Sequence, residues 1–377
     1  MKRLGILGGN QVAQMTVQAA ISFGIDTAIL ERFADSPASR LTQYSVVGDW
    51  TDAVALGEFA KMCDVITLEN EFVDAWGLAL LEGRGLSVYP SSETLTLTQD
   101  KFWQKNRLEA EHISLPAFRA VETPDDVIAV GEAFGWPLVL KARRDGHDGY
   151  GNVILQKPTD IHAAWTQLVR RNGRKLMVEQ FISFAAELAV IVVRGRDGII
   201  CTYPVVETIQ RDHICHIVRA PAQISSDIAQ RAAAIARTAV EAVNGVGVFG
   251  VELFLLHDGT LLFNEMAPRP HNAGHFTIEG CVTSQFENHI RAVMGWPLGA
   301  TEMIAPAAVM VNLLGTREGI VHPESVHHAL SVPAAHIHFY GKRVVDFGRK
   351  MGHVTVLGAT LEEAETVALH AANWVDL

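Results

Sequence analysis

Residues 248–275 read Val-Phe-Gly-Val-Glu-Leu-Phe-Leu-Leu-His-Asp-Gly-Thr-Leu-Leu-Phe-Asn-Glu-Met-Ala-Pro-Arg-Pro-His-Asn-Ala-Gly-His. Two apolar runs rich in strand-forming residues flank Asp258-Gly259, a dipeptide that favours a two-residue hairpin turn. Counting outward from such a turn, Glu252 faces Glu265 across the two strands. The sequence therefore predicts a hairpin that brings two carboxylates together on one face.

Two facing carboxylates in an apolar hairpin need a compensating charge, because like charges directly opposite each other destabilise a sheet. Mg²⁺ is commonly held by one or two carboxylates together with the phosphates of a nucleotide, so Glu252 and Glu265 are candidate metal ligands. Alternatively, one acid is protonated or both reach solvent at the end of the hairpin.

The residues after the second strand favour an anion site. Arg269-Pro270-His271-Asn272 cannot continue as helix or central strand, because proline lacks the amide donor. The Arg269 guanidinium offers a fixed fork for a small oxyanion such as bicarbonate or phosphate. His271 and His275 also have the spacing of a zinc pair on a helix, but Gly274 and the absence of helical periodicity argue against zinc.

Composition narrows the class of protein. The chain has 377 residues, 49% of them hydrophobic and 19% charged, which is typical of globular proteins with two or three domains. A formal net charge of −11 argues against general binding to nucleic acid or to anionic membranes. Four widely spaced cysteines without metal-ligand spacing, and no apolar run long enough to span a bilayer, predict a cytoplasmic protein.

The N-terminal segment is typical of a βαβ unit with a phosphate-binding turn. A strand at residues 4–7 leads through Gly8-Gly9-Asn10 into a helix over residues 11–23, followed by a strand that ends at Glu31. Glu31 suggests a nicotinamide dinucleotide as an alternative, although Asn10 and Ala13 stand where that pattern has glycine. Glu71 follows another buried strand; it is a candidate ligand of a substrate amine or ribose, or else a cap of the next helix.

Two lysines and a glycine-rich loop suggest a phosphate site in the middle of the chain. Lys101 opens a helix, and Lys141 stands near the end of an apolar strand, where it either snorkels to solvent or neutralises a phosphate. Gly146, Gly149 and Gly151 make a loop whose N–H groups can cover phosphates, with a plain hairpin turn as the alternative.

The remaining elements predict a mixed α and β architecture. Strands are expected at residues 177–182, 187–193, 199–203, 308–314, 337–340 and 354–357, and helices from Ser225 or Ser226 to Asn244 and over residues 361–374. Lys342, Arg349 and Lys350 stand on glycine-flanked turns, which are either solvated loops or an anion site.

Motifs along the whole chain then resemble one known family. They are Gly-Gly-Asn-Gln (8–11), Thr-Leu-Glu-Asn-Glu (67–71), Gln-Asp-Lys (99–101), Leu-Val-Leu-Lys (138–141), Gly-His-Asp-Gly-Tyr-Gly-Asn (146–152), Glu-Gln-Phe-Ile (179–182), the stretch from Phe263 to His275, Tyr-Gly-Lys (340–342) and Gly-Arg-Lys-Met-Gly-His (348–353). Their order resembles the 5-(carboxyamino)imidazole ribonucleotide synthetases, which are ATP-grasp enzymes of purine biosynthesis.

The resemblance implies a fold and a domain organisation. We expect an α/β and α+β chain with a Rossmann-like pre-ATP-grasp domain at residues 1–98 and an ATP-grasp domain at 99–300, with a small lid at about 115–182. A β-rich C-terminal domain would follow at 301–377. The implied reaction is carboxylation of aminoimidazole ribonucleotide by bicarbonate through carboxyphosphate, with ATP and Mg²⁺ as cofactors and a homodimer as the assembly.

The resemblance also implies roles for individual residues. ATP would be held by Lys101, Lys141, Gly146, His147, Asp148, Gly149, Tyr150, Gly151, Asn152, Glu179, Gln180, Phe181, Ile182, Glu187, Gln210, Asn264 and Glu265. The ribonucleotide and bicarbonate would contact Gln11, Glu71, Asp148, Arg269, His271, Asn272, Lys342 and Arg349. Of these, Arg269, His271, Asp148 and Lys342 would be catalytic, and Glu252 and Glu265 would bind the metal.

The chain departs from the family pattern at several loop positions. These are Asn10, Ala13, His147, Tyr150, Asn152, Gln210 and Ala273. The resemblance therefore extends to the carboxylation chemistry more directly than to the orientation of the substrate and the contacts of the nucleotide loop. Three other functions remain open at this point: an ATP-grasp ligase with another amine acceptor, a nicotinamide-dependent dehydrogenase and a catalytically silent nucleotide-binding protein.

Overall fold

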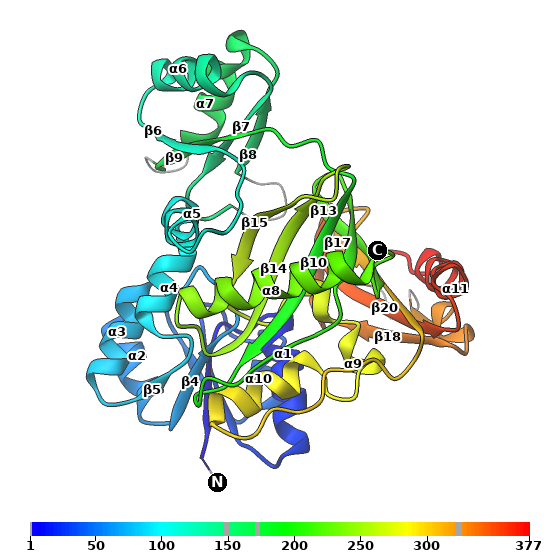
Figure 1. Cartoon of the computed structure of the whole chain (residues 1–377). Helices are drawn as coiled ribbons and strands as arrows, with labels where there is room; N and C mark the ends of the chain where they lie inside the picture. The colour runs from blue at the N-terminus through cyan, green and yellow to red at the C-terminus, as the bar shows by residue number, and fades with distance from the viewer. Residues whose placement is uncertain (1, 147–150, 170–173, 322–325) are drawn as a thin grey trace.

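The computed structural model describes residues 2–146, 151–169, 174–321 and 326–377 (Figure 1). The predicted loop residues 147–150 lie outside the described residues. Within the described part the chain forms a parallel sheet near the N-terminus, a small antiparallel sheet in the middle and a large antiparallel sheet that includes the C-terminal strands.

The N-terminal region is a parallel sheet with helices on both faces. Its strand order is β3-β2-β1-β4-β5, and its buried strands are continuous apolar runs, as parallel sheets covered on both faces require. The carboxyl ends of β1, β2 and β4 therefore lie along one edge, where Gly8 and Glu69 follow β1 and β4 and where Glu31 ends β2. The elements are β1 (Leu4–Leu7), α1 (Gln11–Ser22), β2 (Thr27–Glu31), β3 (Tyr44–Val47), α2 (Ala53–Ala60), β4 (Val65–Leu68), α3 (Ala75–Gly83), β5 (Ser87–Val88) and α4 (Ser92–Gln99).

The middle of the chain forms a small antiparallel sheet with strand order β6-β9-β7-β8, and Figure 1 shows it standing apart from the rest of the molecule. The N-terminal end of α6 is fixed by Thr123 and Asp126, which form a reciprocal capping box. The elements are α5 (Lys101–Glu109), β6 (Phe118–Val121), α6 (Pro124–Phe134), β7 (Leu138–Ala142), β8 (Asn152–Leu155), α7 (Ile161–Val169) and β9 (Leu176–Gln180). Helix α5 lies below this sheet in Figure 1 and leads the chain into it.

The large sheet joins the acid hairpin to the C-terminal strands. Its strand order is β15-β14-β10-β12-β13-β16-β20-β18, with β11 paired to β10, so β15 is an edge strand. Its strands are β10 (Ala186–Arg194), β11 (Ile200–Thr202), β12 (Val206–Arg211), β13 (Ile214–Ala220), β14 (Gly247–Leu255), β15 (Leu261–Ala267), β16 (Ala307–Leu314), β18 (Ala335–Phe339) and β20 (Lys350–Gly358). The helices are α8 (Ser226–Ala242), α9 (Thr277–Gly280), α10 (Gln285–Met294) and α11 (Leu361–Asn373), and β17 (Gly319–Ile320) pairs with β19 (Val344–Val345).

The hairpin of β14 and β15 corrects one prediction and confirms another. The predicted two-residue turn is wrong, because it would pair Phe254 with Phe263, whereas Phe254 pairs with Leu262. The loop has three residues and places Gly259 at a φ of 83°, a conformation that glycine adopts without strain. One extra residue on β15, a β-bulge at Asn264, then shifts the register back.

Because of this bulge, Glu252 pairs with Glu265, as predicted. This pair therefore depends on two local irregularities that offset each other. Neither irregularity is visible in a simple alternating pattern of apolar residues.

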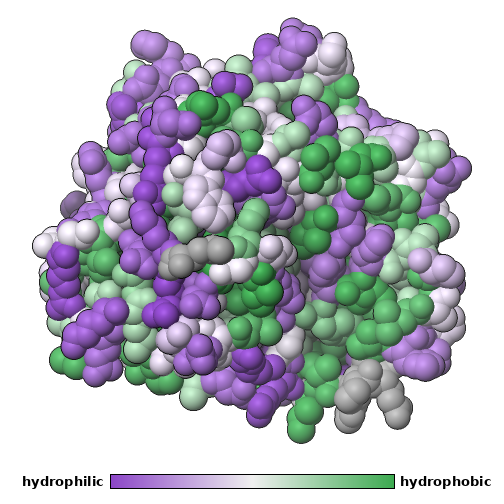
Figure 2. All heavy atoms as spheres, turned by 90° about the horizontal axis from the view of Figure 1, so that it is seen from below, coloured by the Kyte–Doolittle hydropathy of each residue, from purple (hydrophilic) through white to green (hydrophobic). Residues whose placement is uncertain are grey.

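Figure 2 shows one face, on which hydrophobic residues form several groups separated by hydrophilic ones. Scattered apolar residues are usual on protein surfaces. Among the described residues, no helix is both long enough and apolar enough to cross a membrane.

Candidate active site

Side chains from all three sheets line one cavity of about 1140 Å³. It contains most of the residues that the sequence predicted: Gln11, Glu71, Lys101, Lys141, Gly146, Asn152, Glu179, Gln180, Phe181, Ile182, Glu187, Gln210, Glu252, Asn264, Glu265, Arg269, His271, Asn272, Lys342 and Arg349. Gly151 is not among the lining residues; its carbonyl accepts the Ala142 N–H at 2.7 Å. His147, Asp148, Gly149 and Tyr150 lie outside the described residues.

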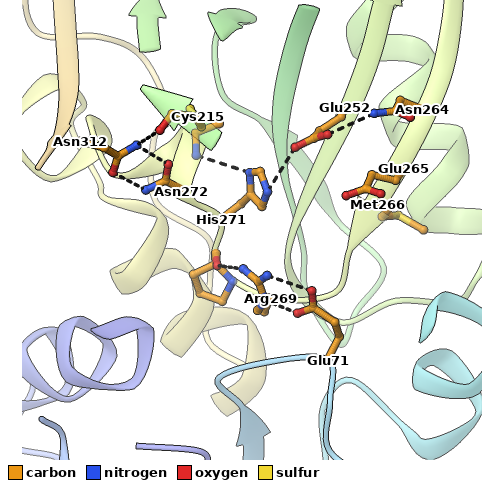
Figure 3. Close-up of polar contacts among 12 residues, drawn as sticks. Glu71, Cys215, Glu252, Asn264, Glu265, Met266, Arg269, His271, Asn272 and Asn312 are labelled. Carbon is orange, nitrogen blue, oxygen red and sulfur yellow. Dashed lines mark hydrogen bonds and ion pairs between the residues drawn. The ribbon is translucent and has the colours of Figure 1, made fainter. Parts of the chain in front are cut away.

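The two acids of the hairpin face each other beside a lysine and a histidine. Asn264, the bulged residue, donates from Nδ2 to Glu252 Oε2 at 3.3 Å, and His271 Nε2 lies 3.5 Å from Glu252 Oε1 (Figure 3). The Lys101 ammonium pairs with Glu265. Burial raises the pKa of Glu252, and nearby lysines, Lys101 first, offset part of that rise.

The acid-bearing edge strand is held by a residue that sequence reasoning missed. Gln104 on α5 donates from Nε2 to the Met266 carbonyl at 2.9 Å, and its Oε1 accepts the Met266 N–H at 3.0 Å. The side chain of Gln104 thus replaces the neighbouring strand that the edge strand β15 lacks. Because Met266 follows Glu265, this contact fixes the backbone next to the acid. The only signal for Gln104 in the sequence was its position on α5, four residues before the apolar Leu108.

Two lysines form ion pairs with Glu179 in the small sheet. Lys141 Nζ lies 2.7 Å from Glu179 Oε2, and Lys105 Nζ lies 3.3 Å from Glu179 Oε1. Burial alone would raise the pKa of Glu179, but Lys105 and Lys141 lower it to about 2. The carboxylate of Glu179 therefore stays ionised and is occupied by lysines. Lys105 was not among the residues predicted from the sequence.

An aromatic pair and a half-buried acid line the same cavity. The rings of Phe184 and Phe254 are stacked with centroids 4.9 Å apart, and both line the cavity beside the predicted residues 180–182. Burial, followed by the charge of Glu252, raises the pKa of Glu187 to about 7. Gln210 hydrogen-bonds the Glu187 side chain and so opposes part of that rise. The aromatic pair was also missed by the sequence analysis.

Arg269 extends toward the N-terminal region. Its Nε and its second terminal nitrogen both donate to the Glu71 carboxylate, the latter at 3.0 Å (Figure 3). Burial would raise the pKa of Glu71, but Arg269 lowers it to about 2, so Glu71 remains a carboxylate. Gln99 Nε2 donates to the Glu71 carbonyl at 2.6 Å and fixes the backbone of this segment.

The backbone after Arg269 is fixed by amide side chains. Gln285 Oε1 accepts the His271 N–H at 2.9 Å, and Gln285 Nε2 donates to the His271 carbonyl at 2.7 Å. Asn272 and Asn312 exchange two hydrogen bonds at 2.9 and 2.7 Å, which tie the segment to β16 (Figure 3). Gly250 allows the histidine to approach, because a Cβ there would lie 2.4 Å from His271 Cβ.

The zinc alternative finds no support in this geometry. His275 is buried, its Nδ1 lies 3.0 Å from Gln285 Nε2, and burial lowers its pKa. In the described ranges, no three histidine, cysteine or acidic side chains come together as the ligands of a zinc site do.

Basic residues of the C-terminal turns form another wall of the cavity. Lys342 Nζ donates to the Lys350 carbonyl at 2.7 Å, and Arg349 donates to the Val344 carbonyl at 2.9 Å. Arg40 of the N-terminal region donates to the Gly341 carbonyl at 2.9 Å and was not predicted. The turn that carries Lys342 is therefore attached to the N-terminal region.

Glu31 accepts hydrogen bonds from backbone N–H groups at the N-terminal turn. Gly8 has a φ of 101°, and the Gly9 N–H donates to Glu31 Oε2 at 2.7 Å. The Arg32 N–H donates to the other oxygen of Glu31 at 2.6 Å. A carboxylate that binds its own turn is poorly placed to bind a nicotinamide ribose, so the dehydrogenase alternative loses its main feature.

This combination of a small antiparallel sheet, a large sheet with paired acids and lysines between them defines an ATP-grasp protein, and family models agree. An ATP-grasp domain matches residues 106–286, a ribonucleotide synthetase preATP-grasp domain matches 1–99, and a phosphoribosylaminoimidazole carboxylase C-terminal domain matches 308–367. The chain belongs to the N5-carboxyaminoimidazole ribonucleotide synthase family.

Similarity to individual proteins extends over the whole chain. It is 37% identical over 376 residues to an N5-carboxyaminoimidazole ribonucleotide synthase of Mycobacterium bovis, covering 99% of this chain and 87% of the relative. It is 42% identical over 369 residues to a phosphoribosylaminoimidazole carboxylase of Schizosaccharomyces pombe, covering 96% of this chain but only 66% of the relative's length. A crystal structure of carboxyaminoimidazole ribonucleotide synthase from Aspergillus clavatus complexed with ATP matches with a TM-score of 0.91, 38% identity and 99% coverage of both chains.

Proposed function

We propose that this chain catalyses the ATP-dependent carboxylation of 5-aminoimidazole ribonucleotide by bicarbonate. The products would be N5-carboxyaminoimidazole ribonucleotide, ADP and phosphate. The observation that carries the proposal is that one cavity holds the facing acids, the lysine cluster, Arg269 with His271, and the basic C-terminal turns. A solved relative is a complex with ADP and 5-aminoimidazole ribonucleotide, which supports the choice of acceptor.

The nucleotide would lie between the small sheet and the acid hairpin. Phe184 and Phe254 offer a flat apolar surface for adenine, next to the connector at residues 180–182. Glu187 lies on the same wall and suits a ribose hydroxyl. Lys101 and Lys141 would contact the phosphates. Asp148 and its neighbours in the loop at 147–150 stay predictions.

The residues present fit a divalent cation. Glu252 and Glu265 face each other, and the raised pKa of Glu252 shows that its negative charge is costly where it stands. A cation between these acids would relieve that cost, and hard oxygen ligands suit Mg²⁺. Bound there, Mg²⁺ would draw charge off the phosphates of ATP.

The second half of the reaction would take place at Arg269 and His271. A bicarbonate oxygen attacks the γ-phosphorus and ADP leaves, which gives carboxyphosphate. The amine nitrogen of the ribonucleotide then attacks the carboxyl carbon, phosphate leaves and the amine gives up one proton. Lys342 and Arg349 suit the phosphate of the ribonucleotide, and Gln11, Glu71 and Asn272 would orient the rest of that substrate.

Assembly and location remain predictions of the same proposal. We infer a homodimer in the cytoplasm, with small molecules as the partners and neither nucleic acid nor membrane. The net charge of −11 supports the exclusion of nucleic acid and of membranes as partners.

The decisive experiment measures ADP release from Mg·ATP. We expect release to require both bicarbonate and aminoimidazole ribonucleotide, and Glu265→Gln to lower turnover by about a hundredfold or more because one metal ligand is lost. If another amine accelerates ADP release and the ribonucleotide does not, the chain is an ATP-grasp ligase with a different acceptor. An Arg349→Ala variant should raise the KM for the ribonucleotide while the KM for ATP stays unchanged.

A further inference from the structure

The lysine cluster around Glu179 contains one more cation than the predicted nucleotide contacts account for. Lys105 is 1% exposed and Glu179 is 2% exposed, so both side chains are almost fully buried. Lys141, by contrast, lines the cavity, whereas Lys105 is not among its lining residues. Lys105 therefore does not contact a ligand, and its charge must act through its neighbours.

Burying an ammonium is costly unless it compensates another charge. Lys105 Nζ and Glu179 Oε1, both of them buried, form an ion pair at 3.3 Å. The other side of Lys105 faces the ring of Phe263, with Nζ 5.8 Å from the ring centroid. Burial lowers the pKa of Lys105 to about 8, and Glu179 opposes that shift.

The net charge of Lys105, Lys141 and Glu179 follows from their ion pairs. Lys105 and Lys141 share one carboxylate, so the three side chains together keep one positive charge when all are ionised. Without Lys105, Glu179 and Lys141 would form a neutral pair with their atoms 2.7 Å apart. A neutral pair attracts a polyphosphate far less than a free ammonium does.

We propose that Lys105 is a positioning residue of the nucleotide site: it compensates Glu179 from the buried side, so that Lys141 retains its positive charge for the phosphates of ATP. Lys105, Lys141 and Glu179 stand on α5, β7 and β9, so the cluster also connects helix α5 to the small sheet. This inference rests on the proposed function, in which Mg·ATP occupies the cavity.

The test is a double-mutant cycle in which the dissociation constant of Mg·ATP is measured by calorimetry on the full chain. Lys105→Met removes the buried charge and keeps the shape, and we expect binding to weaken about tenfold. Adding Glu179→Gln to Lys105→Met restores the single positive charge of the cluster, so the double variant should bind Mg·ATP more tightly than Lys105→Met alone. A role in packing alone predicts the opposite, since removing a second buried group would weaken binding further.

Two results would overturn the inference: unchanged ATP affinity in Lys105→Met, or a double variant that binds no better than the single one. If Lys105→Met does not fold, Lys105→Gln, which keeps a polar end, takes its place in the cycle. Lys61→Met, which removes an exposed lysine of the N-terminal region, is the matched control and should bind ATP as the parent does. Failure of the parent itself to bind Mg·ATP would contradict the proposed function, and so the two failures are distinguishable.

Discussion

Arg269 illustrates how single residues of this site hold one another in place. Both donors of its fork bind the Glu71 carboxylate, which is ionised because its pKa is lowered to about 2. An oxyanion that is to use this face of the guanidinium must compete with Glu71. Glu71 therefore limits the access of other anions to Arg269.

Replacing Glu71 with glutamine should separate these two roles. We expect Glu71→Gln to lower the KM for bicarbonate several-fold, because a neutral amide is a weaker competitor for Arg269, and to raise the KM for the ribonucleotide. Steady-state ADP release at varied concentrations of each substrate measures both constants. Glu58→Gln, at an exposed acid of the same region, serves as the control, and an increased KM for bicarbonate in Glu71→Gln would contradict the competition.

At the scale of elements, helix α5 connects the two sheets that surround the nucleotide cavity. Lys101 pairs with Glu265 of β15, Gln104 bonds the backbone of Met266, and Lys105 pairs with Glu179 of β9. A single turn of helix thus contacts both the acid hairpin and the small sheet. We expect substitutions on this turn to affect stability and metal binding together.

Gln104→Leu tests this connection. It would leave a buried N–H and a buried carbonyl of Met266 without partners, and we expect a loss of about 3 kcal/mol in unfolding free energy. Chemical denaturation measures the loss, and Gln230→Leu on the exposed face of α8 is the helical control. A loss below about 0.5 kcal/mol would show that water or backbone movement satisfies the edge strand instead.

Comparison of elements shows what the sequence could predict. The strands that precede Glu71 and Arg269, and the glycine-flanked turns of Lys342 and Arg349, could be predicted because each is a local pattern. The bulge at Asn264 could not be, since an extra residue leaves no mark in an alternating run. Gln104 and Lys105 were missed because their partners are distant in sequence, and on α5 they resemble ordinary helix residues.

At the scale of the whole molecule, one buried histidine joins the N-terminal region to the large sheet. His289 on α10 accepts the Val248 N–H at Nδ1, 3.1 Å away, which leaves Nε2 to donate to Thr67 Oγ1 at 2.7 Å. One imidazole therefore joins the N-terminal sheet to the acid hairpin. Burial lowers its pKa to about 3, so the ring is neutral in the folded protein.

This depressed pKa predicts a dependence of stability on pH. Below about pH 6.5 the unfolded chain protonates this histidine and the folded chain does not, so unfolding becomes easier as the pH falls. Between about pH 7 and pH 5 the parent should lose about 2 kcal/mol more of its unfolding free energy than His289→Gln does. Denaturation curves at both pH values measure this difference, and equal losses would contradict it; His257→Gln, at an exposed histidine, is the control.

The strand order of the large sheet determines where the chain can be shortened. Strand β13 is hydrogen-bonded on one side to β12 and on the other to β16, so a protein shortened before β16 would expose a row of unpaired amides and carbonyls along β13. Such an open edge invites pairing with a second molecule. Truncated versions of this chain are accordingly poor subjects for crystallisation or expression trials, whereas insertions in exposed loops leave the ladder of strands intact.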